Sequence, residues 1–394
     1  MAPREREPIV NEELIRHVER RTAAVGDDVA KLRLVRNSVA RHEAATRRRE
    51  EFLRRSVETR RQRVRLAIFI PLTALLLAFS LTPTGSRTPI HRPIPIKIRP
   101  VTESPAPKVW LVERKASLEI YSNGLRVENE FLTSTRTRSY RAFDRRSWLA
   151  SGWETRPAGI VFHTTESRMA PFEPSQNDRL QSNGHNLLSF IAKNHLYHFV
   201  IDRFGRVFRV VAETDYANHA GRSVWADDKF IYWSLNQSFL GVAFEAQTES
   251  ADIATRAQID AARVLTEMLR SRYRIPVADC VTHAQVSVNL QSMRLGYHTD
   301  WAANFPFRDV GLGDGYNTPV AALTLFGFDY DSAFLQANGG RVWPGLVIAE
   351  EQIVQEAAAH GTTLELYRRK LRQRFHDWKP ENAGSASDDA SGDR

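Results

Sequence analysis

Several imidazole and carboxylate side chains of this chain stand at or beyond the ends of apolar runs. Two such runs end on histidines, His163 and His283, and a third ends on Glu245. His298 and Asp300 follow further along the chain. Two histidines and a carboxylate are the ligand set of a catalytic zinc that keeps an open position for water. A glutamate outside that set can take a proton from this water, which zinc makes acidic.

Each of these residues also has an ordinary structural explanation. A histidine that ends a buried strand is often a core residue with one hydrogen bond, and a glutamate in that place is often a surface residue. The cysteine content narrows the choice of site. The 394 residues include one cysteine, Cys280, which excludes an intrachain disulfide and a thiolate zinc cluster. We expect Cys280 to be a small buried side chain.

The formal net charge of +9 is unevenly distributed. Residues 1–65 hold 18 Lys and Arg against 11 Asp and Glu, a net charge of +7. The remaining 329 residues have a net charge of only +2. The basic balance therefore describes the N-terminal segment, and it gives no reason to expect a nucleic-acid-binding protein.

Residues 66–82, LAIFIPLTALLLAFSLT, contain no charge and are long enough for a short transmembrane helix. Nine Lys and Arg precede this run within 46–65, and four follow it within 83–102. Because the more positive side stays in the cytoplasm, we expect a single-pass signal anchor in the inner (cytoplasmic) membrane. The N-terminus would be cytoplasmic and the rest periplasmic or extracellular.

The segments on either side of this predicted span differ in character. Residues 1–65 read as a charged helical segment, with valines at a seven-residue spacing that is interrupted by Gly26. A weak homodimer through this helix and a solvated, partly helical segment are equally good interpretations. Residues 83–107 are rich in proline and are typical of an extended linker.

Residues 108–310 show the pattern of a folded domain. Asn123-Gly124 lies between apolar runs, as in a β-hairpin turn, and further strands are expected at 159–163, 196–202, 207–211, 240–247 and 277–283. A capping-box pattern opens a helix at 255–272. Strands and helices alternate irregularly, which predicts a mixed α/β fold, with a central mixed β-sheet flanked by helices.

The C-terminal part of the chain has a different composition. Residues 311–379 are expected to form a helical extension, with helices at 348–359 and 363–376, that packs on the preceding domain. Residues 380–394 read as a disordered acidic tail. No function follows from either segment.

Residues 155–310 resemble the zinc-dependent N-acetylmuramoyl-L-alanine amidases of the amidase-2 type, which share their fold with the peptidoglycan recognition proteins. Five blocks carry the resemblance, in the family's order: IVFHTTES, YHFVIDRFGRVFRV, NHAGRSVW, NQSFLGVAFE and ADCVTHAQVS. The resemblance implies a Zn²⁺ cofactor and a peptidoglycan or muropeptide substrate. It implies no nucleic-acid partner.

The resemblance also assigns roles to single residues. It implies His163, His283 and Asp300 as metal ligands, and Glu245 as the catalytic glutamate. Tyr197 falls on a tyrosine that helps catalysis in some members. His298 falls where many members keep a lysine or threonine that stabilises the oxyanion.

Two neighbouring histidines receive no metal role. His198 should point to the opposite face of its strand from Tyr197 and pack there. His219, in the His-Ala-Gly segment, should shape the substrate groove.

Some positions depart from the family pattern. Trp301-Ala302 replaces the family's Pro-Gly, Asn218 replaces a tryptophan, and Asp300 lies 17 positions after His283, further than is usual in the family. The third ligand is therefore open between Asp300, favoured by the match of DWAANFPF, and His298 with Asp300 as its hydrogen-bond partner. The predicted function is a membrane-anchored amidase that cleaves the amide between N-acetylmuramic acid and L-alanine. A non-catalytic peptidoglycan-binding module is the alternative.

Overall fold

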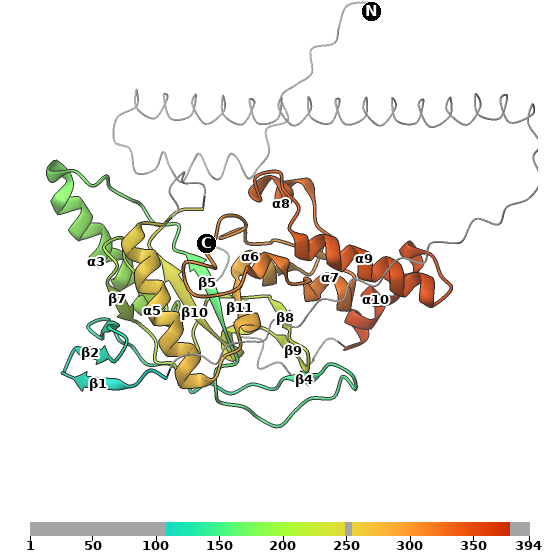
Figure 1. Ribbon diagram of the computed structural model, residues 1–394, viewed down its shortest axis with the longest axis horizontal. Helices are drawn as coiled ribbons and strands as arrows, with labels where there is room; N and C mark the ends of the chain where they lie inside the picture. The colour runs from blue at the N-terminus through green and yellow to red at the C-terminus, as the bar shows by residue number, and fades with distance from the viewer. Residues whose placement is uncertain (1–107, 249–253, 379–394) are drawn as a thin grey trace, which may run out of the picture. The chain divides into compact units, whose positions relative to one another are not determined.

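The computed structural model of the chain describes residues 108–248 and 254–378. These residues lie within one compact unit, Pro100–Arg394. A mixed β-sheet runs through the described part, and helices lie on its faces and beside it (Figure 1). The predicted mixed α/β architecture is therefore confirmed for these residues.

The main sheet has eight strands in the order β1-β2-β3-β7-β6-β10-β5-β11. Its central strands β6, β10, β5 and β11 are parallel, whereas β1, β2 and β3 pair antiparallel, as do β6 and β7. Every residue of β5 and β10 is buried, as expected for parallel strands that are covered on both faces. The strands are β1 (Leu111–Arg114), β2 (Leu118–Tyr121), β3 (Arg126–Glu128), β5 (Gly159–Thr164), β6 (Phe199–Ile201), β7 (Val207–Arg209), β10 (Phe239–Phe244) and β11 (Cys280–Thr282).

Most predicted strands are present, with shifted ends. The Asn123-Gly124 turn joins β2 to β3, and Gly124 has a φ of 84°, a conformation that suits glycine. The strand predicted at 277–283 is shorter than expected, because a capping box of Thr282 and Gln285 starts α6 (His283–Val286). His283 therefore begins a helix at the end of β11 instead of ending the strand.

Helix α5 (Arg256–Tyr273) covers one face of the sheet. The predicted capping box is present, with the Thr255 hydroxyl accepting from the Gln258 backbone N–H at 3.1 Å. Leu265 and Leu269 are fully buried against strand residues such as Phe162. Burial of a leucine side chain stabilises a fold by about 1.5–3 kcal/mol, so this interface anchors the strands β5 and β10.

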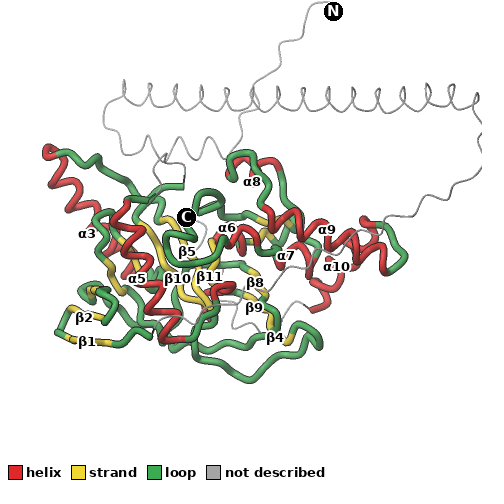
Figure 2. Tube along the Cα trace, in the orientation of Figure 1, coloured by secondary structure: helices red, strands yellow, loops and turns green. Residues whose placement is uncertain are grey.

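Helix α3 (Asn177–Lys193) and several shorter elements surround the rest of the sheet (Figure 2). Helix α3 was not predicted, and of its seventeen residues only Leu188 and Ile191 are buried. These two pack with Val200 and Phe208 of the sheet. The remaining short elements are β4 (Phe143–Asp144), β8 (Val224–Ala226), β9 (Phe230–Trp233), β12 (Val288–Asn289), β13 (Arg294–Leu295), α4 (Leu235–Ser238), η1 (Pro174–Gln176), η2 (Val277–Asp279) and η3 (Gly315–Asn317).

The C-terminal helices form a second core with the segments around the sheet. These helices are α7 (Ala321–Phe326), α8 (Ser332–Ala337), α9 (Pro344–Ala359) and α10 (Leu364–Trp378). The helices expected at 348–359 and 363–376 are present as parts of α9 and α10, and α9 starts earlier at Pro344, a residue favoured in the first helical turn. Ala284 and Ala302 lie in the same apolar cluster as these helices, so the extension packs on the preceding domain.

Part of the sequence-based prediction concerns residues outside the described ranges. These are the charged segment 1–65, the span 66–82, the linker 83–107 and the tail 380–394. Among residues 108–248 and 254–378, no helix has the length and apolar character needed to cross a membrane.

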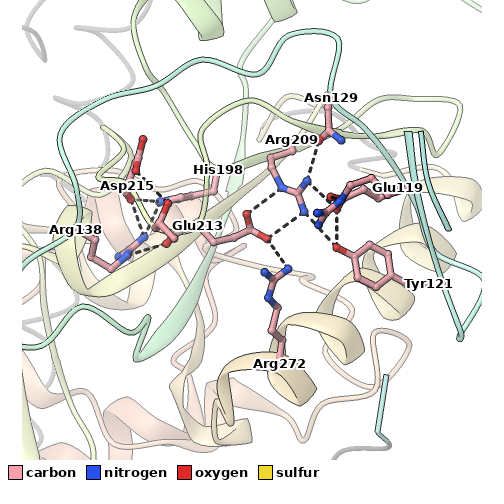
Figure 3. Close-up of polar contacts among 11 residues, drawn as sticks. Glu119, Tyr121, Asn129, Arg138, His198, Arg209, Glu213, Asp215 and Arg272 are labelled. Atoms are coloured by element: carbon pink, nitrogen blue, oxygen red, sulfur yellow. Dashed lines mark hydrogen bonds and ion pairs between the residues drawn. The ribbon is translucent and has the colours of Figure 1, made fainter. Parts of the chain in front are cut away.

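A buried ion-pair network joins the hairpin of β2 and β3 to β7 (Figure 3). The guanidinium of Arg209 lies 2.9 Å from a carboxylate oxygen of Glu119 and 2.9 Å from one of Glu213. It also donates to Asn129 Oδ1 at 2.8 Å. The pKa of Glu119, which burial alone would raise, is lowered by the hydroxyl of Tyr121 and by Arg209. The hairpin is thus joined to the sheet by charge as well as by strand pairing.

Removal of this central charge should strongly destabilise the protein. In Arg209→Met the carboxylates of Glu119 and Glu213 stay buried without their main partner, which costs about 3–5 kcal/mol. The loss can be measured as a lower urea midpoint. Arg256→Met is the control, because Arg256 forms an exposed pair with Asp260 and its loss should change the midpoint little. Equal midpoints for the two variants would contradict the importance of the buried network.

Candidate metal centre

Two neighbouring parallel strands bring His163 and His283 together. Thr282 of β11 lies opposite Phe162 of β5, so the residues that follow them, His283 and His163, lie side by side at the same edge of the sheet. The two imidazole centroids are 4.5 Å apart. The local cause is the pairing of β5, which contains His163, with β11, which His283 directly follows.

Asp300 lies between the two histidines. One carboxylate oxygen, Oδ2, is 3.0 Å from Nδ1 of His163, and the other, Oδ1, is 2.8 Å from Nδ1 of His283. The carbonyl oxygen of Asp300 accepts from the backbone N–H of Ala284, which ties this segment to α6. Among the described residues, the three side chains form a group whose candidate ligand atoms lie within 4.8 Å of one another.

His219 determines the hydrogen position on His163. Nε2 of His219 lies 3.3 Å from the carbonyl oxygen of Phe239, which can only accept, so we assign the hydrogen of a neutral His219 to Nε2. Nδ1 of His219 then accepts from Nε2 of His163 at 3.2 Å. In a neutral His163 this leaves an electron pair on Nδ1, facing the carboxylate of Asp300.

Two acceptors that face each other at 3.0 Å require a cation between them or a proton. Nε2 of His283 adds a buried ring nitrogen with no hydrogen-bond partner in the described part of the chain. Two imidazole nitrogens and one carboxylate are the donor set that zinc takes in open catalytic sites. The arrangement therefore fits a zinc ion, with an outer partner on one histidine as is usual for metal ligands.

The electrostatics of the group also suit a cation. Burial and the imidazole of His283 lower the pKa of His163 to about 4. Burial lowers the pKa of His219 well below 6.5. Burial alone would raise the pKa of Asp300, but the imidazoles of His283 and His163 hold it well below its usual range. At neutral pH the group thus combines an uncharged His163 with the ionised carboxylate of Asp300.

The glycine of β10 makes the contact with His219 possible. A β-carbon at Gly241 would lie 2.6 Å from Cγ of the His219 ring, so a larger residue would displace that ring. The backbone N–H of His219 donates to Asn236 Oδ1 at 2.9 Å, which fixes the loop. His219 was expected to shape the substrate groove, and in the structure its Nδ1 lies 3.2 Å from Nε2 of His163. His219 and Gly241 belong to two separate sequence blocks, HAG and LGVAFE. Neither block by itself predicts that the two residues meet beside His163.

Glu245 follows the last residue of β10. Ala243 lies opposite His163 in the parallel pair of β10 and β5, so Glu245, two residues on, projects from the same face as His163. The Glu245 side chain is buried, and its carboxylate accepts from the backbone N–H of Arg203 at 3.2 Å. Burial raises the pKa of Glu245 above its usual 4.5, and the hydrogen bond from Arg203 opposes this effect.

Tyr197 lies beside His163, and His298 lies beside His283. The Tyr197 ring lies 5.1 Å from that of His163, and burial raises the pKa of the half-buried phenol, which stays protonated. The exposed imidazole of His298 stacks on His283, with centroids 4.7 Å apart and planes at 17°. His298 is not a member of the ligand group, which contains Asp300 instead.

Strand alternation, the basis for the expected orientation of His198, is absent at this position. Strand β6 starts at Phe199, and Tyr197 has a φ of 51°, so strand alternation does not apply to Tyr197 and His198. The buried His198 ring lies 5.6 Å from that of His219 and accepts from the Gly241 N–H. Its packing role is as expected. Cys280 is buried, also as expected.

Comparison with known proteins assigns the central part of the chain to a family. Residues 153–300 match the Amidase_2 family model, described as N-acetylmuramoyl-L-alanine amidase. The predicted amidase-2-type domain, and with it the amidase class of enzyme, is thereby confirmed for this segment. A search of curated proteins found no match.

Solved structures with detectable similarity include amidases and a recognition protein. The amidase AmiD from E. coli, in complex with anhydro-N-acetylmuramic acid-L-Ala-D-gamma-Glu-L-Lys, is 19% identical, with 52% of this chain and 91% of that chain covered and a TM-score of 0.32. The amidase LysC from Clostridium intestinale URNW is 22% identical, with 39% and 83% covered and a TM-score of 0.25. The Drosophila peptidoglycan recognition protein SD is 17% identical, with 40% and 85% covered and a TM-score of 0.26.

Proposed function

Because residues 153–300 form an amidase-2 domain, we propose that the chain is a zinc-dependent amidase that acts on peptidoglycan or muropeptides. It hydrolyses the amide that joins N-acetylmuramic acid to L-alanine. The observation that carries the proposal is the convergence of His163, His283 and Asp300 in one buried group. A recognition module without catalysis would need neither this complete donor set nor a buried glutamate on the same face.

The three residues of the group have distinct tasks. His163 and His283 hold the ion through ring nitrogens, and Asp300 supplies the negative charge that offsets it. When bound, zinc polarises the substrate carbonyl and makes a water molecule acidic enough to ionise near neutral pH. His219 holds His163 in the tautomer that has its hydrogen on Nε2, which leaves the electron pair of Nδ1 facing Asp300.

Glu245 is the general base and then the general acid. Its carboxylate takes a proton from the attacking water and gives it to the amine that leaves with L-alanine. Burial raises the pKa of Glu245, which makes it a stronger base than an exposed glutamate. The Arg203 backbone N–H keeps the carboxylate in one orientation.

Tyr197 and His298 stabilise the oxyanion that develops on the substrate carbonyl. The raised pKa of Tyr197 keeps its hydroxyl as a donor over the pH range of the reaction. His298 is exposed beside His283, so it can reach substrate without displacing a ligand. Donors placed at such a position typically contribute about 10²–10³ in rate.

The proposal places this domain outside the cytoplasm. The uncharged run at 66–82 serves as a signal anchor in the inner membrane, with the catalytic domain in the periplasm or outside the cell. The proline-rich linker at 83–107 limits the enzyme to wall near the bilayer. A weak homodimer through residues 1–65 remains part of the proposal, and self-association of an isolated 1–62 peptide tests it.

Digestion of purified peptidoglycan tests the activity. The purified chain with zinc should release stem peptides that carry a free amino group on L-alanine, identified by mass spectrometry. A chelator should prevent their release, because the ligand group would lose its ion. Binding of the chain to peptidoglycan without any release would favour the recognition module. A parallel assay with soluble muropeptides separates a preference for intact wall from a preference for wall fragments.

A further inference from the structure

The segment directly after Asp300 has an unusual backbone. Trp301 has a φ of 56°, in the left-handed region that bulky residues rarely adopt, and its side chain is fully buried. The family match ends at residue 300, so Trp301 and the C-terminal extension lie beyond it. Such a conformation persists only where the surroundings hold it. The contacts of this segment therefore show what holds Asp300 in place.

Trp301 connects the third candidate ligand to the first. Its indole N–H donates to the carbonyl oxygen of His163 at 3.0 Å. Its ring packs against Phe244 and Phe305, with centroids 5.2 Å and 5.1 Å away. The tryptophan thus fixes the distance between β5, which carries His163, and the backbone that carries Asp300.

Two side chains of the extension hold the carbonyl groups of this segment. The Tyr316 hydroxyl donates to the carbonyl oxygen of Trp301 at 2.7 Å and accepts from the Phe305 N–H at 3.2 Å. The Trp343 indole N–H donates to the carbonyl oxygen of Ala302 at 2.8 Å. The Tyr316 and Trp343 rings lie 5.1 Å apart, so the two donors form one unit.

The same part of the extension also touches the segment of the second histidine. Gln285, which belongs to the capping box that starts α6 at His283, donates from Nε2 to the carbonyl oxygen of Gly315 at 2.8 Å. Gly315 and Tyr316 are adjacent residues of η3. One short segment of the extension is therefore hydrogen-bonded to the chain next to Asp300 and to the helix that begins with His283.

We propose that Tyr316 and Trp343 are positioning residues of the metal centre. They hold the backbone of Trp301 and Ala302 in the conformation that places the Asp300 carboxylate between the two histidines. The C-terminal extension is in this view a built-in support of the third ligand, in place of the Pro-Gly pair of the related amidases. The inference rests on the proposed metal site and does not depend on the reaction catalysed there.

Zinc affinity is the direct readout of this role. Tyr316→Phe removes one hydroxyl and keeps the ring. Because this hydroxyl acts on the backbone next to Asp300 and not on a ligand itself, zinc should bind more weakly by up to about 10–100-fold, the effect of losing an outer partner of a ligand. Competition with a chromophoric chelator measures the affinity. The visible spectrum of the cobalt-loaded protein should also change, because it reports the ligand geometry.

Tyr140→Phe is the matched control. The buried Tyr140 hydroxyl also donates to a carbonyl oxygen, that of Arg156, at 2.8 Å, and Arg156 is not adjacent in the chain to any candidate ligand. Both variants lose one hydroxyl-to-carbonyl bond, and Tyr316→Phe also loses the bond from the Phe305 N–H. Both should lower the melting temperature of the metal-free protein, Tyr316→Phe somewhat more. Only Tyr316→Phe should weaken zinc binding. Should Tyr316→Phe fail to fold, Trp343→Phe, which removes the indole N–H, makes the same test.

The outcomes separate this inference from the proposed function. If the unmodified chain and Tyr316→Phe bind zinc with equal affinity, the positioning role is overturned and the metal site is not. A loss of affinity that Tyr140→Phe shares would also overturn it, because the effect would then be one of general stability. An unmodified chain that binds no zinc would overturn the metal site itself, and the inference with it.

Discussion

Asp300→Asn should lose zinc binding and amide hydrolysis together. The substitution keeps the shape of the side chain but removes the negative charge that lies between Nδ1 of His163 and Nδ1 of His283. The loss of zinc affinity should exceed the roughly 10–100-fold effect of losing an outer partner, because a direct ligand is removed. Chelator competition measures the affinity, and product release from peptidoglycan measures the activity.

His298→Ala is the companion variant that decides between the two candidate ligands. His298 stacks on His283 and lies outside the ligand group, so zinc affinity should stay near that of the unmodified chain. Hydrolysis should fall by about 10²–10³, the effect of removing one oxyanion donor. A chain that loses zinc with His298→Ala but keeps it with Asp300→Asn would make His298 the ligand and Asp300 its partner.

Glu245→Gln should abolish most of the activity and yet stabilise the fold. Loss of a general base typically lowers the rate by about 10²–10⁴. Burial raises the pKa of Glu245 above 4.5, so its ionised form costs stability in the folded state. This cost begins as the pH rises above 4.5 and is complete above the folded-state pKa, so the variant should melt at a higher temperature at pH 7. Over the same pH range the activity of the unmodified enzyme should rise as Glu245 ionises.

Glu119→Gln is the matched control for this pair of effects. The two glutamates are similarly buried, with 5% and 6% of their surface exposed. Although burial alone would raise the pKa of Glu119, the Tyr121 hydroxyl and Arg209 lower it below 4.5. Its charge therefore stabilises the fold above pH 4.5, and this contribution disappears as the pH falls through the folded-state pKa. Glu119→Gln should melt at a lower temperature at pH 7 and keep its activity, and a lower melting temperature for both variants would contradict the account of Glu245.

Local patterns were sufficient to predict the strand that carries His163 and the strand that Glu245 follows. The apolar runs before His163 and Glu245 are buried parallel strands, and such runs are recognisable because both faces of the strand are covered. The capping box of Thr255 and Gln258 likewise marks the start of α5 from sequence alone. The three candidate ligands follow from these strands and from the resemblance to the family.

Contacts between distant segments could not be predicted in this way. His219 reaches His163 across 56 positions of the chain, and only the bare backbone at Gly241 leaves room for its ring. From sequence alone, the departure from the family's Pro-Gly at Trp301-Ala302 leaves the third ligand open between Asp300 and His298. In the structure the same two residues are held by Tyr316 and Trp343, so the departure and the extension belong together. No single-sequence pattern links residues that meet only through such tertiary hydrogen bonds.

The central claim is that the three-residue group binds the zinc ion on which hydrolysis depends. The most direct test is to titrate the metal-free chain with zinc and to follow the release of free L-alanine amino groups from a muropeptide. The three-residue group predicts no hydrolysis without metal and a rise in rate that stops at one zinc ion per chain. Hydrolysis at full rate in the metal-free chain would contradict the metal centre. Zinc bound at one ion per chain without any hydrolysis would contradict the amidase and leave the recognition module.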